Sequence, residues 1–183
     1  MLIAVVGPSG AGKDTLMGGA RAVIAQDTRF RFVRRAITRP AEAGGEDHEA
    51  LSESGFAARR AAGGFALSWE AHGLRYGIPR YIEEDIAARR VVIANLSRAV
   101  LQEASARYRL RVLNITAPME VLAARLAARG RETAADIAAR LTREVALPDG
   151  LDIVRVMNDA DVAEGVARVL AALNRAASDA QGL

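Results

Sequence analysis

The chain has 183 residues, of which 51% are hydrophobic and 26% charged, as expected for one globular domain with a sizeable core. It has no cysteine, which excludes disulfides and thiolate metal sites. The net charge of +3 weakly favours anionic small-molecule ligands over nucleic acid. No transmembrane-length apolar run and no signal-peptide pattern are found, so we expect a cytoplasmic protein, monomeric or homodimeric, that does not bind membranes.

The first 25 residues follow a strand, loop and helix pattern. The apolar run 2–6 predicts a buried strand, and residues 15–25 predict a helix. Between them, the G-x-x-x-x-G-K spacing is typical of a phosphate-binding loop, in which glycine N–H groups and a helix N-terminus converge on a phosphate. The predicted nucleotide-binding residues are Gly7, Pro8, Ser9, Gly10, Ala11, Gly12, Lys13, Asp14 and Thr15. The alternative is a glycine-rich turn that binds nothing.

Lys13 is the only lysine of the chain, and arginine supplies the other permanently positive side chains. Lysine is a compact ammonium on a flexible stem, whereas arginine is a planar fork. This usage indicates that position 13 requires an ammonium, as a phosphate-binding loop does.

After a short strand at 30–33, the strand and helix alternation stops between residues 34 and 79. This stretch contains one predicted helix, at 52–62, and both histidines and the only tryptophan. Functional residues concentrate on irregular segments held by a rigid frame, so we expect an acceptor-binding insert here. The alternative is a surface excursion with an aromatic mini-core of Phe56, Phe65 and Trp69.

Regular alternation then resumes. We expect helices at 79–89 and 97–107, strands at 91–94, 110–115 and 153–157, a helix opened by Pro118, and a last helix at 161–173. Strands that alternate with helices predict an α/β fold with a parallel sheet flanked by helices.

An arginine-rich helical hairpin is predicted at 125–144, broken at Gly130. Phosphoryl transfer requires positive charge around the moving group, so this hairpin is a candidate lid over the phosphates. The alternative is a solvated helical face with i,i+4 charge pairs. The arginines concerned are Arg125, Arg129, Arg131, Arg140 and Arg143.

Together with the loop at 7–15, a series of short motifs resembles guanylate kinases from end to end. These motifs are Thr38-Arg39-Pro40, Phe56, Phe65, Gly73, Tyr76-Gly77, Arg125 to Gly130, Arg140-Leu141 and Asn158-Asp159. The resemblance implies a P-loop nucleoside-monophosphate-kinase fold with a core at 1–34, 80–124 and 148–183, an acceptor-binding insert at about 35–79 and a lid at about 125–147. It also implies ATP and Mg²⁺ as cofactors. The implied catalytic residues are Lys13, Arg129 and Arg140, and the implied further ATP-binding residues are Arg125 and Asn158.

The departures from guanylate kinases concern the acceptor. The acidic residue that recognises guanine falls at Leu67, and a second acidic pair falls at Ile93 and Asn95. Ala41-Glu42 replaces an acceptor-phosphate arginine, and His48 replaces a tyrosine. A site without base-recognition groups cannot select the base, so we expect a phosphorylated acceptor other than GMP.

Within this guanylate-kinase-like chain, four motifs are similar to the ribose 1,5-bisphosphate phosphokinase family of bacterial phosphonate utilisation. They lie at residues 7–15, 35–40, 45–49 and 68–77. This similarity implies transfer of the ATP γ-phosphoryl group to ribose 1,5-bisphosphate, a small phosphorylated sugar. Arg35, Arg39, Arg75 and His48 are candidates for its phosphates, and Glu46, Asp47 and Glu70 for its hydroxyls. Thr38 and Tyr76 complete the predicted substrate-binding set. A hydrated loop is the alternative for Glu46 and Asp47.

Magnesium ligands are less defined, because Asp14 follows the lysine where Ser or Thr is usual. The candidates are Thr15 and Asp14, partly through water. Three other functions are considered: a guanylate kinase with relocated base recognition, a non-catalytic guanylate-kinase-like interaction module, and nucleic-acid binding through the arginines.

Overall fold

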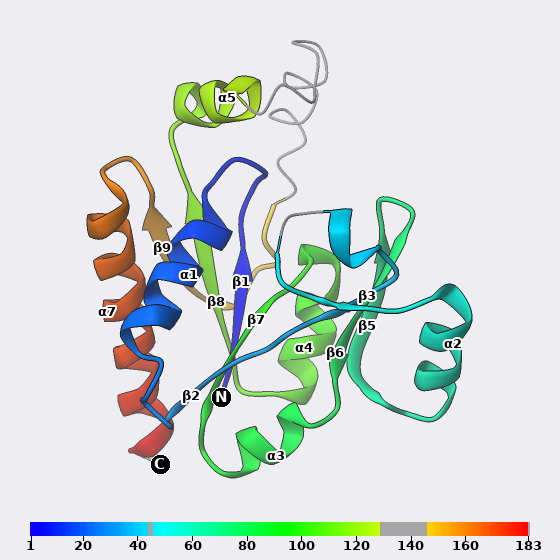
Figure 1. The fold of residues 1–183 in the computed structure, drawn as a ribbon. Helices are drawn as coiled ribbons and strands as arrows, with labels where there is room; N and C mark the ends of the chain where they lie inside the picture. The colour runs from blue at the N-terminus through cyan, green and yellow to red at the C-terminus, as the bar shows by residue number, and fades with distance from the viewer. Residues whose placement is uncertain (44–45, 129–145, 183) are drawn as a thin grey trace.

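The computed structural model describes residues 1–43, 46–128 and 146–182. At its centre lies a parallel sheet of five strands in the order β2-β7-β1-β8-β9 (Figure 1). The strands are β1 (Leu2–Val6), β2 (Phe30–Phe32), β7 (Val91–Asn95), β8 (Leu110–Thr116) and β9 (Asp152–Met157). The predicted α/β fold is confirmed, and the carboxyl ends of β1, β7 and β8 meet at one edge of the sheet.

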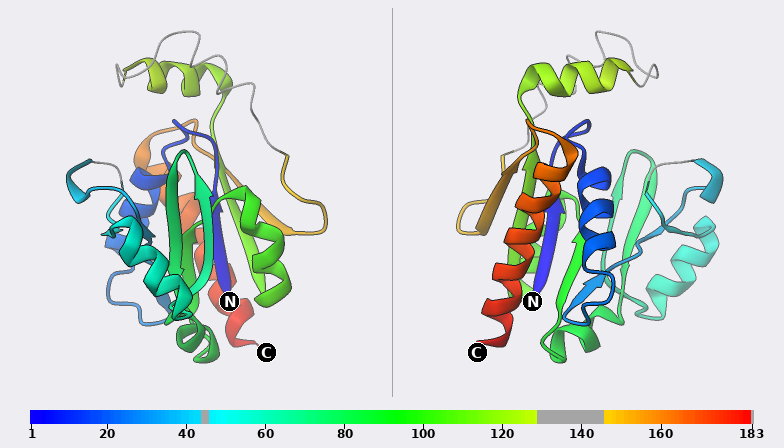
Figure 2. Two further views of the ribbon diagram at one scale, coloured as in Figure 1. Left: turned by 90° about the vertical axis from the view of Figure 1, so that its right-hand side faces the viewer. Right: turned by 60° about the vertical axis from the view of Figure 1, so that its left-hand side comes forward.

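Helices cover both faces of this sheet, which explains why its central strands β1 and β7 are almost continuously apolar. On one face, α1 (Lys13–Val23) and α7 (Val162–Gln181) pack on alternate residues such as Ile3 and Val5. On the other face, α3 (Ile82–Ala87) and α4 (Leu101–Arg107) pack on the residues between them (Figure 2). The helix α5 (Met119–Ala128) lies beyond the carboxyl ends of the strands.

Part of the insert forms a second sheet in the order β4-β3-β6-β5. Its strands are β3 (Ala36–Ile37), β4 (Glu49–Ala50), β5 (Phe65–Ala71) and β6 (Leu74–Pro79). One side of this sheet packs into the core of the main sheet, since Leu67, Trp69 and Ile78 join the cluster that contains Ala4. The other side carries α2 (Glu53–Ala61), which contacts β5 through the stacked rings of Phe56 and Phe65. The insert is thereby packed against the core of the main sheet.

Two short 3₁₀ helices complete the described chain, η1 (Ala41–Ala43) in the insert and η2 (Arg98–Val100) before α4. Two predicted boundaries are wrong. Pro79 ends β6 instead of opening a helix, because the chain continues its pairing with Phe65 of β5. The last helix runs to Gln181, since Ala177 and Ala180 extend its buried face beyond Leu173.

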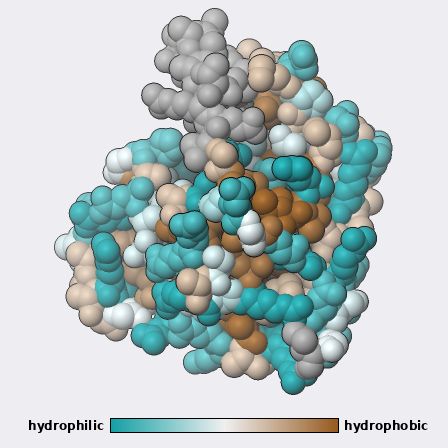
Figure 3. Space-filling view, turned by 180° about the vertical axis from the view of Figure 1, so that it is seen from behind, coloured by the Kyte–Doolittle hydropathy of each residue, from teal (hydrophilic) through white to brown (hydrophobic). Residues whose placement is uncertain are grey.

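The rear of the molecule shows an apolar area in the middle of a largely hydrophilic surface (Figure 3). Partly buried Leu147, Leu151 and Ile153 pack against the core on this side of the sheet. Among the described helices, none is both long and apolar enough to cross a membrane.

Gly18 and Gly19 of α1 offer a matched test of helix packing. A Cβ on Gly19 would lie 2.5 Å from Cγ2 of Val166 on α7, whereas a Cβ on Gly18 would meet no described atom within 4 Å. Alanine is a better helix former than glycine by about 1 kcal/mol, so Gly18→Ala should raise the free energy of unfolding by about that amount. Gly19→Ala should lower it by about 1–3 kcal/mol, because the stiff Val166 must move.

Urea unfolding at equilibrium measures both changes. Adding Val166→Ala to Gly19→Ala should remove the clash and recover part of the loss. Equal stabilisation by the two alanines would contradict the close approach of α1 and α7.

Candidate active site

The glycine loop connects the carboxyl end of β1 to the start of α1, and three of its residues have positive φ. The φ values are 149° at Gly7, 86° at Gly10 and 81° at Gly12, a region that favours glycine. A Cβ on Gly7 would also lie 1.9 Å from the carbonyl oxygen of Ile115 on β8. The glycines of the motif are therefore required both by backbone conformation and by space.

Lys13 is the first residue of α1, and no side chain caps this helix. An uncapped helix N-terminus carries N–H groups and a partial positive charge that favour a bound phosphate. The Lys13 Nζ donates to the carbonyl oxygens of Gly7 at 2.9 Å and Pro8 at 3.0 Å. The only ammonium side chain of the protein is thus held at the loop, where a nucleotide phosphate would bind.

Asn158 and Arg125 hold the backbone of the loop through hydrogen bonds. The buried Asn158 donates from Nδ2 to the carbonyl oxygen of Ala11 at 2.8 Å, and its backbone N–H donates to Thr116 at 2.7 Å. Arg125 of α5 donates to the carbonyl oxygens of Gly10 at 3.5 Å and Asn158 at 3.3 Å. Both predicted nucleotide-site residues therefore contact the loop, although the sequence alone did not indicate this supporting role.

The loop after Asn158 is also tied down by an ion pair. Arg168 of α7 donates to Asp159 at 2.7 Å and to Glu164 at 2.6 Å. The hydrogen bond from Arg168 holds the pKa of the Asp159 carboxyl below its usual value. The neighbourhood of the nucleotide site is consequently anchored to both α5 and α7.

The two metal candidates, Asp14 and Thr15, are exposed on the first turn of α1. In the part of the chain that the structure describes, no three His, Cys, Asp or Glu side chains gather as a metal-binding group. Mg²⁺ usually keeps several waters and uses one or two protein oxygens together with substrate phosphates. One carboxylate and one hydroxyl beside the loop fit such a site.

A second group of polar residues lies at the same edge of the main sheet. Arg35 donates from Nε to Glu46 Oε2 at 3.2 Å and from Nη2 to Glu46 Oε1. Asn95, the last residue of β7, donates from Nδ2 to the same carboxylate at 2.9 Å. Asn95 is the register partner of Val5, two residues before the glycine loop. We call Arg35, Glu46 and Asn95 the junction cluster, because it links the insert to the main sheet.

Arg39 and His48 extend this group. Arg39 Nη2 lies 3.2 Å from His48 Nδ1, and the two ring nitrogens of His48 lie 3.0 Å from the carbonyl oxygens of Glu46 and Arg39. His48 is buried, and Nε of Arg39 is buried without a hydrogen-bond partner. Arg39 forms no ion pair with an acid of the described residues. A guanidinium with a buried, unpartnered N–H group and no carboxylate partner is stabilised when an anion binds to it.

Two aromatic rings form one wall of the junction cluster. Trp69 and Tyr76 stack with their ring centroids 5.4 Å apart and their planes 6° apart. The Arg35 guanidinium lies over both rings, 5.6 Å from Trp69 and 5.1 Å from Tyr76. Trp69 and Asn95 were not predicted site residues. A polar residue ending the apolar strand 91–94 was the available signal for Asn95, whereas nothing in the sequence separated Trp69 from an ordinary core residue.

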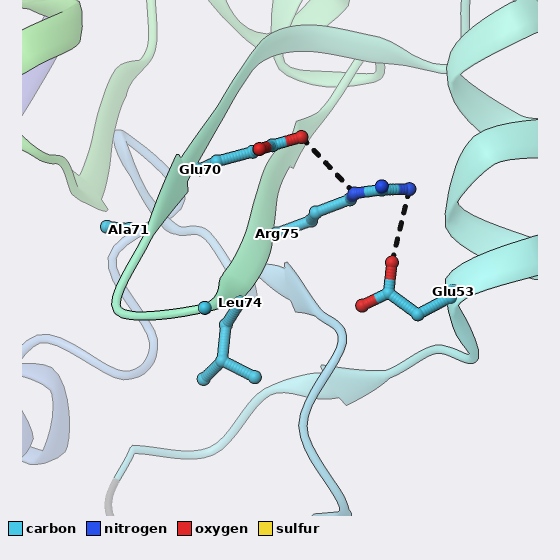
Figure 4. Close-up of a pocket in the computed structure, with 6 residues that line it drawn as sticks. Glu53, Glu70, Ala71, Leu74 and Arg75 are labelled. Atoms are coloured by element: carbon cyan, nitrogen blue, oxygen red, sulfur yellow. Dashed lines mark ion pairs between the residues drawn. The ribbon is translucent and has the colours of Figure 1, made fainter.

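Several predicted substrate residues lie elsewhere. Glu70 and Arg75 face each other across β5 and β6, and neighbouring residues of a strand alternate between faces. They therefore lie on the opposite face from Trp69 and Tyr76, where Arg75 pairs with Glu70 at 3.3 Å and with Glu53 of α2 at 3.1 Å (Figure 4). The structure does not bring Glu70 and Arg75 together with Arg35.

Thr38 and Asp47 also make local contacts. The Thr38 hydroxyl accepts from the backbone N–H of Arg75 at 2.9 Å, which continues the pairing of β3 with β6. Asp47 forms an exposed ion pair with Arg34 at 2.9 Å. Their predicted substrate contacts remain predictions. The lid arginines Arg129, Arg131, Arg140 and Arg143 lie outside the described residues.

The sequence is similar to curated proteins over most of its length. It is 54% identical over 162 residues to a ribose 1,5-bisphosphate phosphokinase from Brucella melitensis, covering 87% of this chain and 84% of the relative. A ribose 1,5-bisphosphate phosphokinase from Ruegeria sp. is 55% identical, covering 82% of this chain and 78% of the relative. The chain belongs to the ribose 1,5-bisphosphate phosphokinase family.

Some members of this family are parts of longer proteins. A bifunctional ribose 1,5-bisphosphokinase-thymidine phosphorylase from Azorhizobium caulinodans is 53% identical over 92% of this chain, which matches 25% of that protein. Among solved structures, a guanylate kinase from Anaplasma phagocytophilum has a TM-score of 0.67 at 18% identity, covering 96% of this chain and 84% of that one. That likeness establishes a guanylate-kinase-like fold. No family model matches the chain.

Gly12→Ala tests the contact between the loop and Asn158. A Cβ at Gly12 would lie 2.4 Å from Nδ2 of Asn158, in addition to the strain of a positive φ. Gly150 is a matched control, since it has a φ of 78° but its Cβ would meet no described atom within 4 Å. We expect Gly150→Ala to lose about 1–2 kcal/mol of stability from backbone strain alone, and Gly12→Ala to lose at least as much. Only Gly12→Ala should lose affinity for a nucleoside triphosphate, measured by isothermal titration calorimetry. Equal affinities in the two variants would show that Asn158 does not position the loop.

Proposed function

We propose that this chain transfers the γ-phosphoryl group of ATP to the 1-phosphate of ribose 1,5-bisphosphate. The products are 5-phosphoribosyl 1-diphosphate and ADP, and the reaction serves phosphonate degradation. Membership of the ribose 1,5-bisphosphate phosphokinase family supports this function over that of a guanylate kinase.

The proposal depends mainly on which residues occupy the positions at which guanylate kinases recognise their base. Leu67 and Ile93 are 2% and 3% exposed and belong to the hydrophobic core. Asn95 directs its amide at Glu46. A site without free groups to hydrogen-bond guanine loses the discrimination that such groups provide. The guanidinium groups of Arg35 and Arg39 suit a sugar that carries phosphates.

At the donor end, the glycine loop and Lys13 would hold the ATP phosphates, with Arg125 and Asn158 supporting the loop. Asp14 and Thr15 would hold Mg²⁺, which when bound neutralises charge on the β- and γ-phosphates. We assign the catalytic positive charge to Lys13 together with Arg129 and Arg140 of the proposed lid, at about 125–147.

At the acceptor end, Arg39 with its buried, unpartnered Nε would bind the reacting phosphate. The reaction requires no general base from the described side chains, because the attacking group is already an anionic phosphate oxygen. The chain's contribution is therefore to position two anionic groups and to offset their repulsion. We propose that residues of about 35–79 act as the acceptor-binding insert on the core.

A phosphoryl-acceptor panel tests the proposal. With ATP and Mg²⁺, ADP should form when ribose 1,5-bisphosphate is the acceptor. With GMP as the acceptor, the rate of ADP formation should be lower by about 100-fold or more, because the site has no group that hydrogen-bonds the base. Formation of ADP with GMP alone would overturn the proposed function and favour a guanylate kinase.

Lys13 provides the matched catalytic test. Lys13→Ala should lower kcat about 100-fold or more, since a cation aimed at the transferring group is lost. Lys13→Arg should also be impaired, because a planar fork does not replace a compact ammonium. Circular dichroism should show both variants folded. Full activity in Lys13→Ala would contradict catalysis at the glycine loop, whereas a native chain that phosphorylates no acceptor would favour a non-catalytic module.

A further inference from the structure

The junction cluster has the form of an anion-binding site that is filled by the protein's own carboxylate. Two N–H groups of Arg35 and one of Asn95 converge on Glu46. The side chains of Arg35 and Glu46 are only 14% and 16% exposed. Converging donors from a guanidinium and an amide, largely shielded from water, bind any oxyanion of suitable size strongly.

The Arg35 guanidinium and the backbone of Asn95 are held in place independently of Glu46. Arg35 Nη1 donates to the backbone carbonyl of Asn95 at 3.2 Å, and its guanidinium lies over the rings of Trp69 and Tyr76. The backbone of Asn95 is fixed by the pairing of β7 with β1. Glu46, in contrast, lies between η1 and β4 and belongs to neither sheet. The carboxylate can therefore leave while the donors stay.

A second cation stands beside this site. His48 contacts both the backbone of Glu46 and the side chain of Arg39, so the two arginines flank the segment 46–48. Arg39 has a buried Nε without a partner, whereas Arg35 is already paired. Two cationic positions in one site match an acceptor with two phosphates. Among the described residues, a carboxylate fills only the position at Arg35.

We propose that Glu46 is a resident anion, which the second, non-reacting phosphate of the acceptor displaces from Arg35 and Asn95. This inference rests on the proposed function, since it requires an acceptor with two phosphates. A ligand without a second phosphate leaves the ion pair of Arg35 and Glu46 intact. If such a ligand broke the pair, the largely buried Arg35 guanidinium would lose its counter-ion, which is strongly unfavourable. The exchange thereby selects a sugar bisphosphate against nucleoside monophosphates.

Ribose 5-phosphate is the probe, because it carries only the second phosphate. Its dissociation constant is measured by isothermal titration calorimetry without ATP, for the native chain and for Glu46→Gln. If Glu46 competes with the phosphate, Glu46→Gln binds the probe about tenfold more tightly or better. If Glu46 instead holds a ribose hydroxyl, or the pair is permanent, the variant binds equally or more weakly, and the proposal is overturned.

Glu49→Gln is the matched control. It removes the same charge from the same region, but Glu49 pairs with Arg59 at 2.7 Å and is 40% exposed. Its affinity for ribose 5-phosphate should equal that of the native chain. A gain equal to that of Glu46→Gln would show a general charge effect and overturn the assignment.

Asn95→Asp keeps the proposal testable if Glu46→Gln does not fold. It replaces a donor by a carboxylate of the same shape, so ribose 5-phosphate should bind about tenfold more weakly or worse. Unchanged binding would contradict the role of Asn95 as a phosphate donor.

Inorganic phosphate, as a second probe, separates a sugar-phosphate site from a free-phosphate site. Glu46→Gln should gain affinity for ribose 5-phosphate; a gain for inorganic phosphate alone would overturn the sugar assignment. Because these titrations contain no ATP, they are independent of phosphoryl transfer. A chain that binds ribose 5-phosphate as expected but phosphorylates only GMP would refute the proposed function and leave the anion site standing.

Discussion

The Arg35 guanidinium connects the two sheets of this protein. Its N–H groups reach a carboxylate of the insert and a backbone carbonyl at the end of β7, while its plane lies over two rings of β5 and β6. A planar group with donors on several edges can satisfy all these contacts at once, which an ammonium cannot. The contacts set the insert against the edge of the main sheet where the glycine loop begins.

The donor side depends on a different kind of constraint, the close approach of backbone segments. Gly7 leaves room for the carbonyl oxygen of Ile115, and Gly12 leaves room for the amide of Asn158. Parallel strands place their carboxyl ends together, and ligands of open α/β sheets bind there. The loop, α5 and the segment after β9 therefore meet at this edge, although they lie far apart in the sequence.

Arg35 and Arg39 differ in the way their charge is balanced. Arg35 has a carboxylate partner, whereas Arg39 has an imidazole and a buried Nε without a hydrogen bond. A buried charge without a counter-ion is costly unless a ligand supplies one. This imbalance makes Arg39 the position where a bound anion gains most, and it leaves Arg35 responsive only to an anion that competes with Glu46.

The sequence by itself determined the parallel α/β fold and the glycine loop with its lysine, because these depend on local periodicity and on residue spacing along the chain. The family followed from the resemblance of its short motifs to those of known kinases. The sequence also located the loss of base-recognition acids at Leu67, Ile93 and Asn95. Only the tertiary structure decided which of the predicted substrate residues meet. Strand alternation turned Glu70 and Arg75 away from Tyr76, and Arg35 was found paired with Glu46 and Asn95. Such contacts join segments up to 60 residues apart, and their partners are set by how the two sheets pack, which no local pattern encodes.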